Sequence, residues 1–72
     1  MAKRIGLVSA RMKAGFNQRE LAHALGVNVV YLCRIENGLQ KGSYDFWRRV
    51  RGVLGFSAEE VDAIIDEGGE IK

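Results

Sequence analysis

The stretch from Asn17 to Gly38 constrains the fold more than any other part of the chain, because it predicts two short helices joined by one tight turn. Asn17 is a good N-cap, and Glu20 follows three residues later, where a capping box places an acid. Gly26 is typical of a helix C-terminus, since glycine readily adopts the left-handed conformation found there. Asn28 can then cap the next helix. Two short helices around a turn that contains glycine make a helix-turn-helix.

Several short motifs in this stretch follow one another at a specific spacing. They are Asn17-Gln18, Leu21-Ala22, Gly26-Val27, Asn28, Leu32 and Ile35-Glu36-Asn37-Gly38. In this pattern the chain resembles the helix-turn-helix of the Cro/lambda-repressor family, the Xre-type regulators, over a region from about Leu7 to Ser57. The resemblance implies an all-α, compact five-helix lambda-repressor-like DNA-binding domain over residues 1–67, with the helix-turn-helix formed by helices 2 and 3 at about 17–38. Residues 68–72 are expected to form a flexible tail.

The remaining sequence predicts three further helices around this motif. Apolar spacing indicates one helix over residues 5–14, ahead of the motif. Ser43 can cap another over residues 44–54. Ser57 opens a capping box for the fifth helix, which Gly68-Gly69 would end.

The charges of the chain are distributed unevenly. Residues 1–54 contain ten Lys and Arg against three Asp and Glu, a net charge of +7, whereas residues 55–72 contain one against six, a net charge of −5. A basic body with an acidic end favours a surface that binds a polyanion. The alternative is a solvated surface on which the charges cluster by chance.

Other classes of function have little support in the sequence. The single His23 and the single Cys33 have no partners at the spacing of a catalytic or metal site, so we expect no enzyme, metal or cofactor. A lone cysteine fits a reducing compartment. The longest apolar runs fall well short of the roughly 20 residues that span a bilayer, and the run near the N-terminus is too short for a signal peptide. The sequence therefore predicts a cytoplasmic protein that does not enter a membrane.

The helix predicted over Val29–Glu36 would be the recognition helix, because an α-helix fits the major groove. By position, the residues expected to face the bases are Val29, Val30, Tyr31, Cys33 and Arg34. Leu32 and Ile35 would face the core. Arg34 can make a bidentate contact with guanine, whereas the two valines offer only apolar contact, which suits a thymine methyl group. The alternative for so apolar a helix is burial or binding to a protein.

A second set of residues is expected to contact phosphate or to hold the motif together. The phosphate set is Gln18, Arg19, Asn28, Asn37 and Lys41. For Gln18 and Asn37 this role is implied by the resemblance. The resemblance also implies a structural ion pair between Arg11 and Glu36. Lys3 and Arg4 form a possible basic arm, which we expect to be mobile.

The resemblance implies that the region around the fifth helix forms a dimer contact. The apolar residues there are Phe56, Val61, Ile64 and Ile65. Packing of the same residues on the core of the monomer is the competing interpretation. The family that the chain resembles usually has a proline near the position of Gly42. The loop before Ser43 lacks this proline, so we expect the loop to be flexible.

The sequence as a whole predicts a sequence-specific regulator of transcription, a repressor, that binds double-stranded DNA. It would act as a homodimer on a palindromic operator, through the major groove. The competing hypothesis is a protein-interaction module on the same fold, such as an antitoxin-like or co-regulator subunit. The apolar recognition helix and the acidic fifth helix motivate this second hypothesis.

Overall fold

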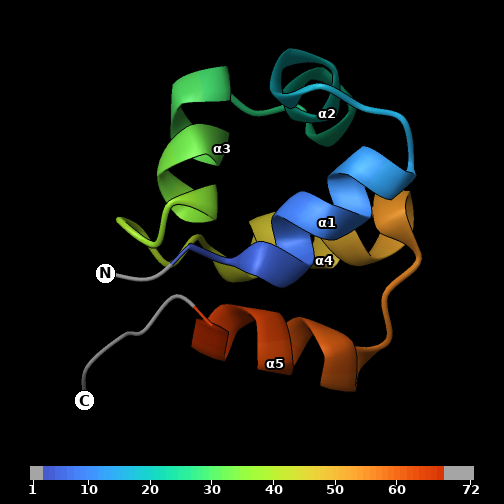
Figure 1. The fold of residues 1–72 in the computed structure, drawn as a ribbon, viewed down its shortest axis with the longest axis vertical. Coiled ribbons are helices and arrows are strands. Elements are labelled where there is room, and N and C mark those ends of the chain that lie inside the picture. The colour runs from blue at the N-terminus through green and yellow to red at the C-terminus, as the bar shows by residue number, and fades with distance from the viewer. Residues whose placement is uncertain (1–2, 68–72) are drawn as a thin grey trace.

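The computed structural model describes residues 3–67, and these residues form five α-helices without a β-strand (Figure 1). The helices are α1 (Ile5–Lys13), α2 (Gln18–Leu25), α3 (Val29–Glu36), α4 (Tyr44–Leu54) and α5 (Ala58–Glu67). The predicted all-α five-helix fold is confirmed, and only the end of α1 differs, by one residue, from the sequence prediction. The predicted tail, residues 68–72, lies outside the described residues.

Local capping defines both helices of the helix-turn-helix. The Asn17 side chain accepts a hydrogen bond from the Glu20 N–H at 2.7 Å, and the Glu20 carboxylate accepts one from the Asn17 N–H at 2.8 Å. Gly26 ends α2 in the left-handed conformation, with φ of +72°. The Asn28 side chain then accepts from the Val30 N–H at 2.7 Å and begins α3. The predicted capping box and turn are therefore present.

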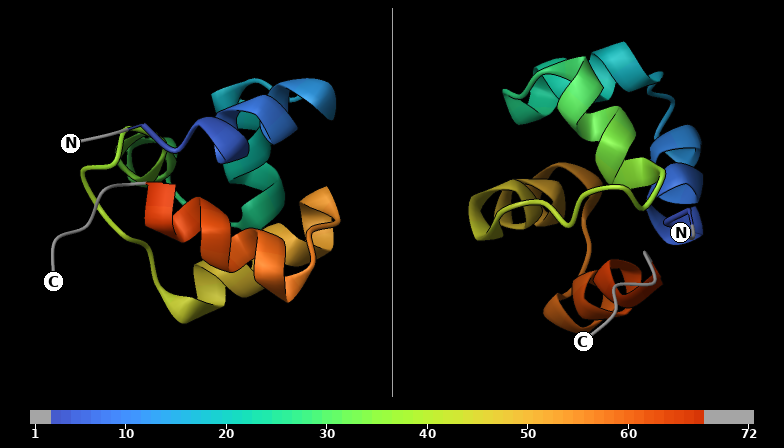
Figure 2. Two further views of the ribbon diagram at one scale, coloured as in Figure 1. Left: turned by 60° about the horizontal axis from the view of Figure 1, so that its bottom comes forward. Right: turned by 90° about the vertical axis from the view of Figure 1, so that its left-hand side faces the viewer.

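The five helices are arranged in three layers (Figures 1 and 2). Helices α1 and α4 lie in the middle, α2 and α3 pack on one side of them, and α5 packs on the other. All five contribute to one core, which consists of Leu7, Leu21, Ala22, Leu25, Leu32, Ile35, Phe46, Trp47, Val50, Val61 and Ile64. Phe46 lies edge-on to both Tyr31 and Trp47, with ring centroids 5.6 and 5.0 Å apart. This aromatic group joins α3 to α4.

Helix α5 is held against the start of α1. The side chain before α1 makes no capping hydrogen bond, and the Glu67 carboxylate of α5 instead accepts from the Gly6 N–H at 2.7 Å. A carboxylate at this end of a helix also interacts favourably with the helix dipole. The close approach requires glycine, because a Cβ at position 6 would lie 2.8 Å from Cγ1 of Ile64.

Candidate nucleic-acid interface

Helix α3 presents one face to the core and the other to solvent. Leu32 and Ile35 are fully buried, as predicted. The helical repeat places Val30, Cys33, Arg34 and Asn37 on the opposite face, which we call the outer face of α3. This outer face is the part of the motif that could reach the edges of bases.

The outer face combines apolar groups with one unengaged cation. Val30 is 55% exposed, and Arg34 is also exposed. Within residues 3–67, no hydrogen bond or ion pair engages the Arg34 guanidinium. Cys33 is half-buried, and its Sγ accepts from the Asn37 amide at 3.4 Å. Val30 and Arg34 also line a shallow depression of about 370 Å³ together with Asn28, Tyr31 and Gln40.

Two residues of the predicted base-contacting set have partners inside the protein. Val29 is half-buried and packs against the core. The ring of Tyr31 packs on Phe46, and its hydroxyl accepts a hydrogen bond from the Ser43 N–H at 3.0 Å. The hydroxyl hydrogen of Tyr31 remains available to donate. Burial was the alternative that the apolar character of this helix left open, but the partners of these two side chains could not be predicted because they lie on other elements.

The residues of the predicted phosphate set differ in how free their side chains are. Arg19 and Lys41 are exposed, so both can reach a phosphate. The Asn28 side chain caps α3, and the Gln18 amide donates to Glu36 at 2.9 Å. Asn37 is the C-cap residue of α3. The N–H groups and the dipole at the start of α2 favour an anion there as well.

A buried carboxylate joins the first three helices. Glu36, at the end of α3, is 2% exposed. Its carboxylate lies 2.8 Å from Nε and 3.4 Å from Nη2 of Arg11, and it also accepts from Gln18. Arg11 donates further to the carbonyl oxygen of Phe16 at 3.1 Å. A buried charge is tolerated where it is paired and hydrogen-bonded in this way. The cluster fixes α3 against α1 and α2.

The same C-terminal end of α3 is also held by Arg4, whose side chain is fully buried. Its Nη1 donates to the carbonyl oxygens of Ile35 at 2.7 Å and Gln40 at 2.8 Å, and its backbone N–H donates to Glu36 O at 2.8 Å. The guanidinium carbon lies 5.8 Å from the centroid of the Trp47 ring. The expectation of a mobile basic arm is therefore wrong for Arg4. The guanidinium is therefore a charged second donor to the Ile35 carbonyl, which also accepts from the Gly38 N–H at 3.1 Å, and it ties the Gln40 carbonyl of the following loop to the same end of the helix.

Sequence periodicity could have indicated that Arg4 faces inward, although not which groups it contacts. Arg4, the buried Leu7 and Arg11 follow one another at spacings of three and four residues. Such spacing places all three on the inward face of one helical path. The basic character of the segment suggested solvent or phosphate instead.

The loop between α3 and α4 is held at three points. Gln40 O accepts from Arg4, Lys41 O accepts from Trp47 Nε1 at 2.8 Å, and the Ser43 N–H donates to Tyr31. Gly42 has φ of +87°, and a Cβ there would lie 3.0 Å from Trp47 Nε1. These contacts oppose the flexibility that we expected from the absence of proline.

The apolar residues of the predicted dimer contact divide into two pairs. Val61 and Ile64 are buried in the core of the monomer, which is the competing interpretation given above. They therefore offer almost no surface to a second copy. Phe56 and Ile65 are half-buried against the same core, and their exposed parts can still meet a partner.

Other kinds of site find no support in the part of the chain that the structure describes. Across residues 3–67 no group of three His, Cys, Asp or Glu side chains is placed to hold a metal ion. No helix in the same range is long and apolar enough to cross a membrane.

Comparison with known proteins gives one match. The family model of a helix-turn-helix domain matches residues 7–64. This range runs from the buried Leu7 of α1 to the buried Ile64 of α5, and so includes all of α2, α3 and α4 and most of α1 and α5. No curated protein and no solved structure matches significantly.

Proposed function

The chain belongs to the helix-turn-helix domain family, and from this premise we propose that it is a sequence-specific, double-stranded DNA-binding regulator of transcription of the Cro/lambda-repressor (Xre) type. It acts as a repressor, as a homodimer in the cytoplasm, on a palindromic operator. The observation that carries the proposal is the exposed, unengaged Arg34 on the outer face of α3. The internal contacts of Arg4 and Glu36 hold the C-terminal end of this helix, two residues beyond Arg34, so the backbone that carries Arg34 is fixed.

The spacing of the outer-face residues suggests what is recognised. Val30 and Arg34 lie one helical turn apart, a rise of about 6 Å along the helix axis. Base pairs are stacked about 3.4 Å apart, so the two side chains would contact bases roughly two steps apart. Arg34 suits guanine, and Val30 suits the methyl group of thymine. We therefore expect each half-site to contain a G and a T about two steps apart.

Affinity would come mainly from phosphate contacts. The body of the chain carries a net charge of +7, and Arg19 and Lys41 are exposed on either side of α3 in the sequence. Such contacts release counterions, so binding weakens as the salt concentration rises. In a dimer, two α3 helices would enter successive major grooves about 34 Å apart.

Selection from a randomised duplex pool at two salt concentrations tests the proposal. We expect a palindromic site to be enriched and its affinity to fall steeply with salt. Arg34→Ala should relax the preference at one position of each half-site, at a cost of about 1–3 kcal/mol. Arg48→Ala is the matched control, because Arg48 is also an exposed arginine but lies on α4. If Arg34→Ala selects the same site as Arg48→Ala, the assignment of Arg34 is wrong.

Lys41→Ala separates phosphate contact from damage to the fold. The contact that Lys41 makes within the protein uses its backbone carbonyl, which the substitution keeps. We expect binding to weaken equally for all sequences and the salt slope to fall by about one.

One observation favours a second function, a protein-interaction module. Val30 is a large apolar side chain left 55% exposed on the outer face, beside the half-buried Cys33. An apolar surface of this kind can also bind a protein. Absence of duplex binding even at low salt would support this function and overturn the regulator proposal.

A further inference from the structure

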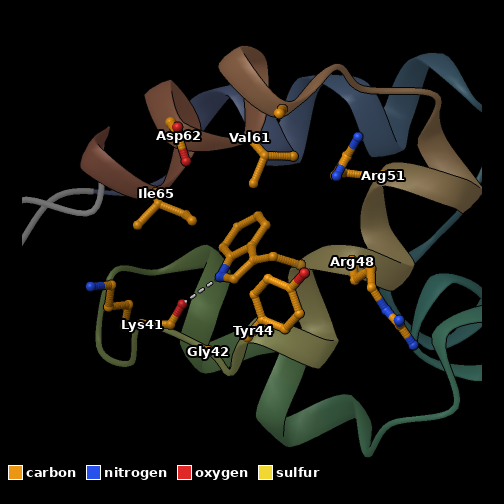
Figure 3. Close-up of a pocket in the computed structure, with 10 residues that line it drawn as sticks. Lys41, Gly42, Tyr44, Arg48, Arg51, Val61, Asp62 and Ile65 are labelled. Atoms are coloured by element: carbon orange, nitrogen blue, oxygen red, sulfur yellow. Dashed lines mark hydrogen bonds between the residues drawn. The ribbon is translucent and has the colours of Figure 1, made fainter.

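A pocket of about 480 Å³ lies between α4, α5 and the loop that follows α3 (Figure 3). Its lining consists of Lys41, Gly42, Tyr44, Trp47, Arg48, Arg51, Ala58, Val61, Asp62 and Ile65. The volume falls within the range of about 300–1,000 Å³ that is typical of small-molecule sites. The pocket is formed by different elements from those of the outer face of α3.

Apolar groups make up opposite walls of the pocket. Val61 and Ile65 of α5 point into it from one side, and Tyr44 lies on the other (Figure 3). Tyr44 is 82% exposed, although it is a large aromatic residue. Trp47 also belongs to the lining. These walls suit a flat or elongated apolar body.

The charges around the pocket favour an anion. Lys41, Arg48 and Arg51 carry three positive charges, against one negative charge on Asp62. Arg48 is engaged at 3.5 Å by Asp45, which lies outside the pocket. No hydrogen bond or ion pair among residues 3–67 engages the Arg51 guanidinium. Arg51 can therefore offer its planar donors to a carboxylate.

We propose that this pocket binds a small amphiphilic carboxylate. The apolar body lies between Tyr44 and the α5 side chains Val61 and Ile65, and the carboxylate pairs with Arg51. Lys41 adds to the positive potential at the other end of the pocket.

The pocket is connected to the recognition helix through short contacts. Lys41 and Gly42 line it and belong to the loop that follows α3. The Trp47 indole donates to Lys41 O, and the next residue after Gly42, Ser43, donates to Tyr31 of α3. A bound carboxylate would therefore change the affinity for DNA. This regulatory part rests on the proposed function, whereas the binding itself does not.

Titration of the ¹⁵N-labelled protein with 2-naphthoate tests the binding. Trp47 is the single tryptophan of the chain, so its indole N–H gives one resonance inside the pocket. We expect saturable shifts of this resonance and of the amides of Gly42 and Val61, and none at His23 on α2. The neutral analogue 2-naphthamide should bind about tenfold more weakly, since it lacks the charge-assisted hydrogen bond.

Two variants with the same net charge show whether Arg51 is the residue that pairs with the carboxylate of the ligand. Arg51→Gln should abolish the preference for naphthoate over naphthamide, because it removes the guanidinium. Lys13→Gln removes a charge at the end of α1, outside the pocket, and should keep the preference. Equal binding of both compounds to the unchanged protein, or shifts spread over the whole surface without saturation, would overturn the site.

The regulatory part has a separate measurement. Naphthoate should change the affinity of the unchanged protein for its selected duplex, and with Arg51→Gln the same change should need about tenfold more naphthoate. Saturable binding in the pocket with an unchanged duplex affinity would overturn the coupling alone. If the protein binds no duplex but the resonances of the pocket still shift saturably with naphthoate, the proposed function is overturned and the proposed binding site is not.

Discussion

Replacing Arg11 with methionine should destabilise the protein severely, because the Glu36 carboxylate would stay buried without its cation. The substitution removes contacts of 2.8 and 3.4 Å and leaves only the Gln18 amide at 2.9 Å. Breaking a buried pair from one side costs about 3–5 kcal/mol. The Arg11 side chain is 12% exposed, so water can partly replace it, and we expect the lower end, about 3 kcal/mol. A domain of this size has a total stability of about 4–11 kcal/mol.

A double-mutant cycle measures the pair itself. The Arg11→Met/Glu36→Met protein buries two apolar side chains where the charges were, and such replacements are often close to neutral. We therefore expect it to be more stable than Arg11→Met, with a coupling energy of about 2 kcal/mol or more. Urea unfolding followed by circular dichroism and by Trp47 fluorescence gives the free energies, provided that the m-values agree.

Arg48→Met is the control for loss of an arginine. Arg48 and Asp45 are 65% and 54% exposed, and their 3.5 Å contact should be worth less than about 1 kcal/mol. The reasoning about burial is refuted if Arg11→Met costs no more than this control. It is refuted equally if the changes in unfolding free energy of Arg11→Met and Glu36→Met are additive in the double mutant.

Three further substitutions test the contacts that position α3 and its loop. Tyr31→Phe keeps the ring packing but leaves the Ser43 N–H without its acceptor, and urea unfolding should show a loss of about 1 kcal/mol; no loss would mean that water serves equally well. Gly42→Ala should cost about 2 kcal/mol or more, because φ is +87° and the new Cβ would lie 3.0 Å from Trp47 Nε1; a smaller loss would show that the loop rearranges easily. Arg4→Met should cost more than about 2 kcal/mol in the same assay, since two carbonyl groups lose a charged donor, and a cost typical of a surface residue would contradict its burial.

The helices could be predicted from the sequence because their signals are local. Asn17, Ser43 and Ser57 each accept from an N–H three residues further along the chain, as the sequence predicts. Such contacts do not depend on the rest of the fold. The apolar repeat likewise placed Leu32 and Ile35 of α3 in the core.

The remaining contacts could not be predicted, because they join residues far apart in the sequence. Nothing near Arg4 in the chain indicates that its donors meet the end of α3. The apolar stripe of α5 predicts an interface, but the position of α1 decides that Val61 and Ile64 are covered within the monomer. The hydroxyl of Tyr31 could equally have met DNA, until the loop brought the Ser43 N–H within 3.0 Å.

The contacts of Arg4 also have a consequence for the order in which the chain folds. Helices α2 and α3 are adjacent in sequence and can associate by closing a short loop, whereas the Arg4 side chain joins positions 31 and 36 residues away. Long loops close at a greater entropic cost, so these contacts should form after the main transition state. Arg4→Met should then accelerate unfolding and change the folding rate little. During synthesis the Arg4 side chain can make its full set of contacts only after Gln40, 36 residues further along the chain, has been added.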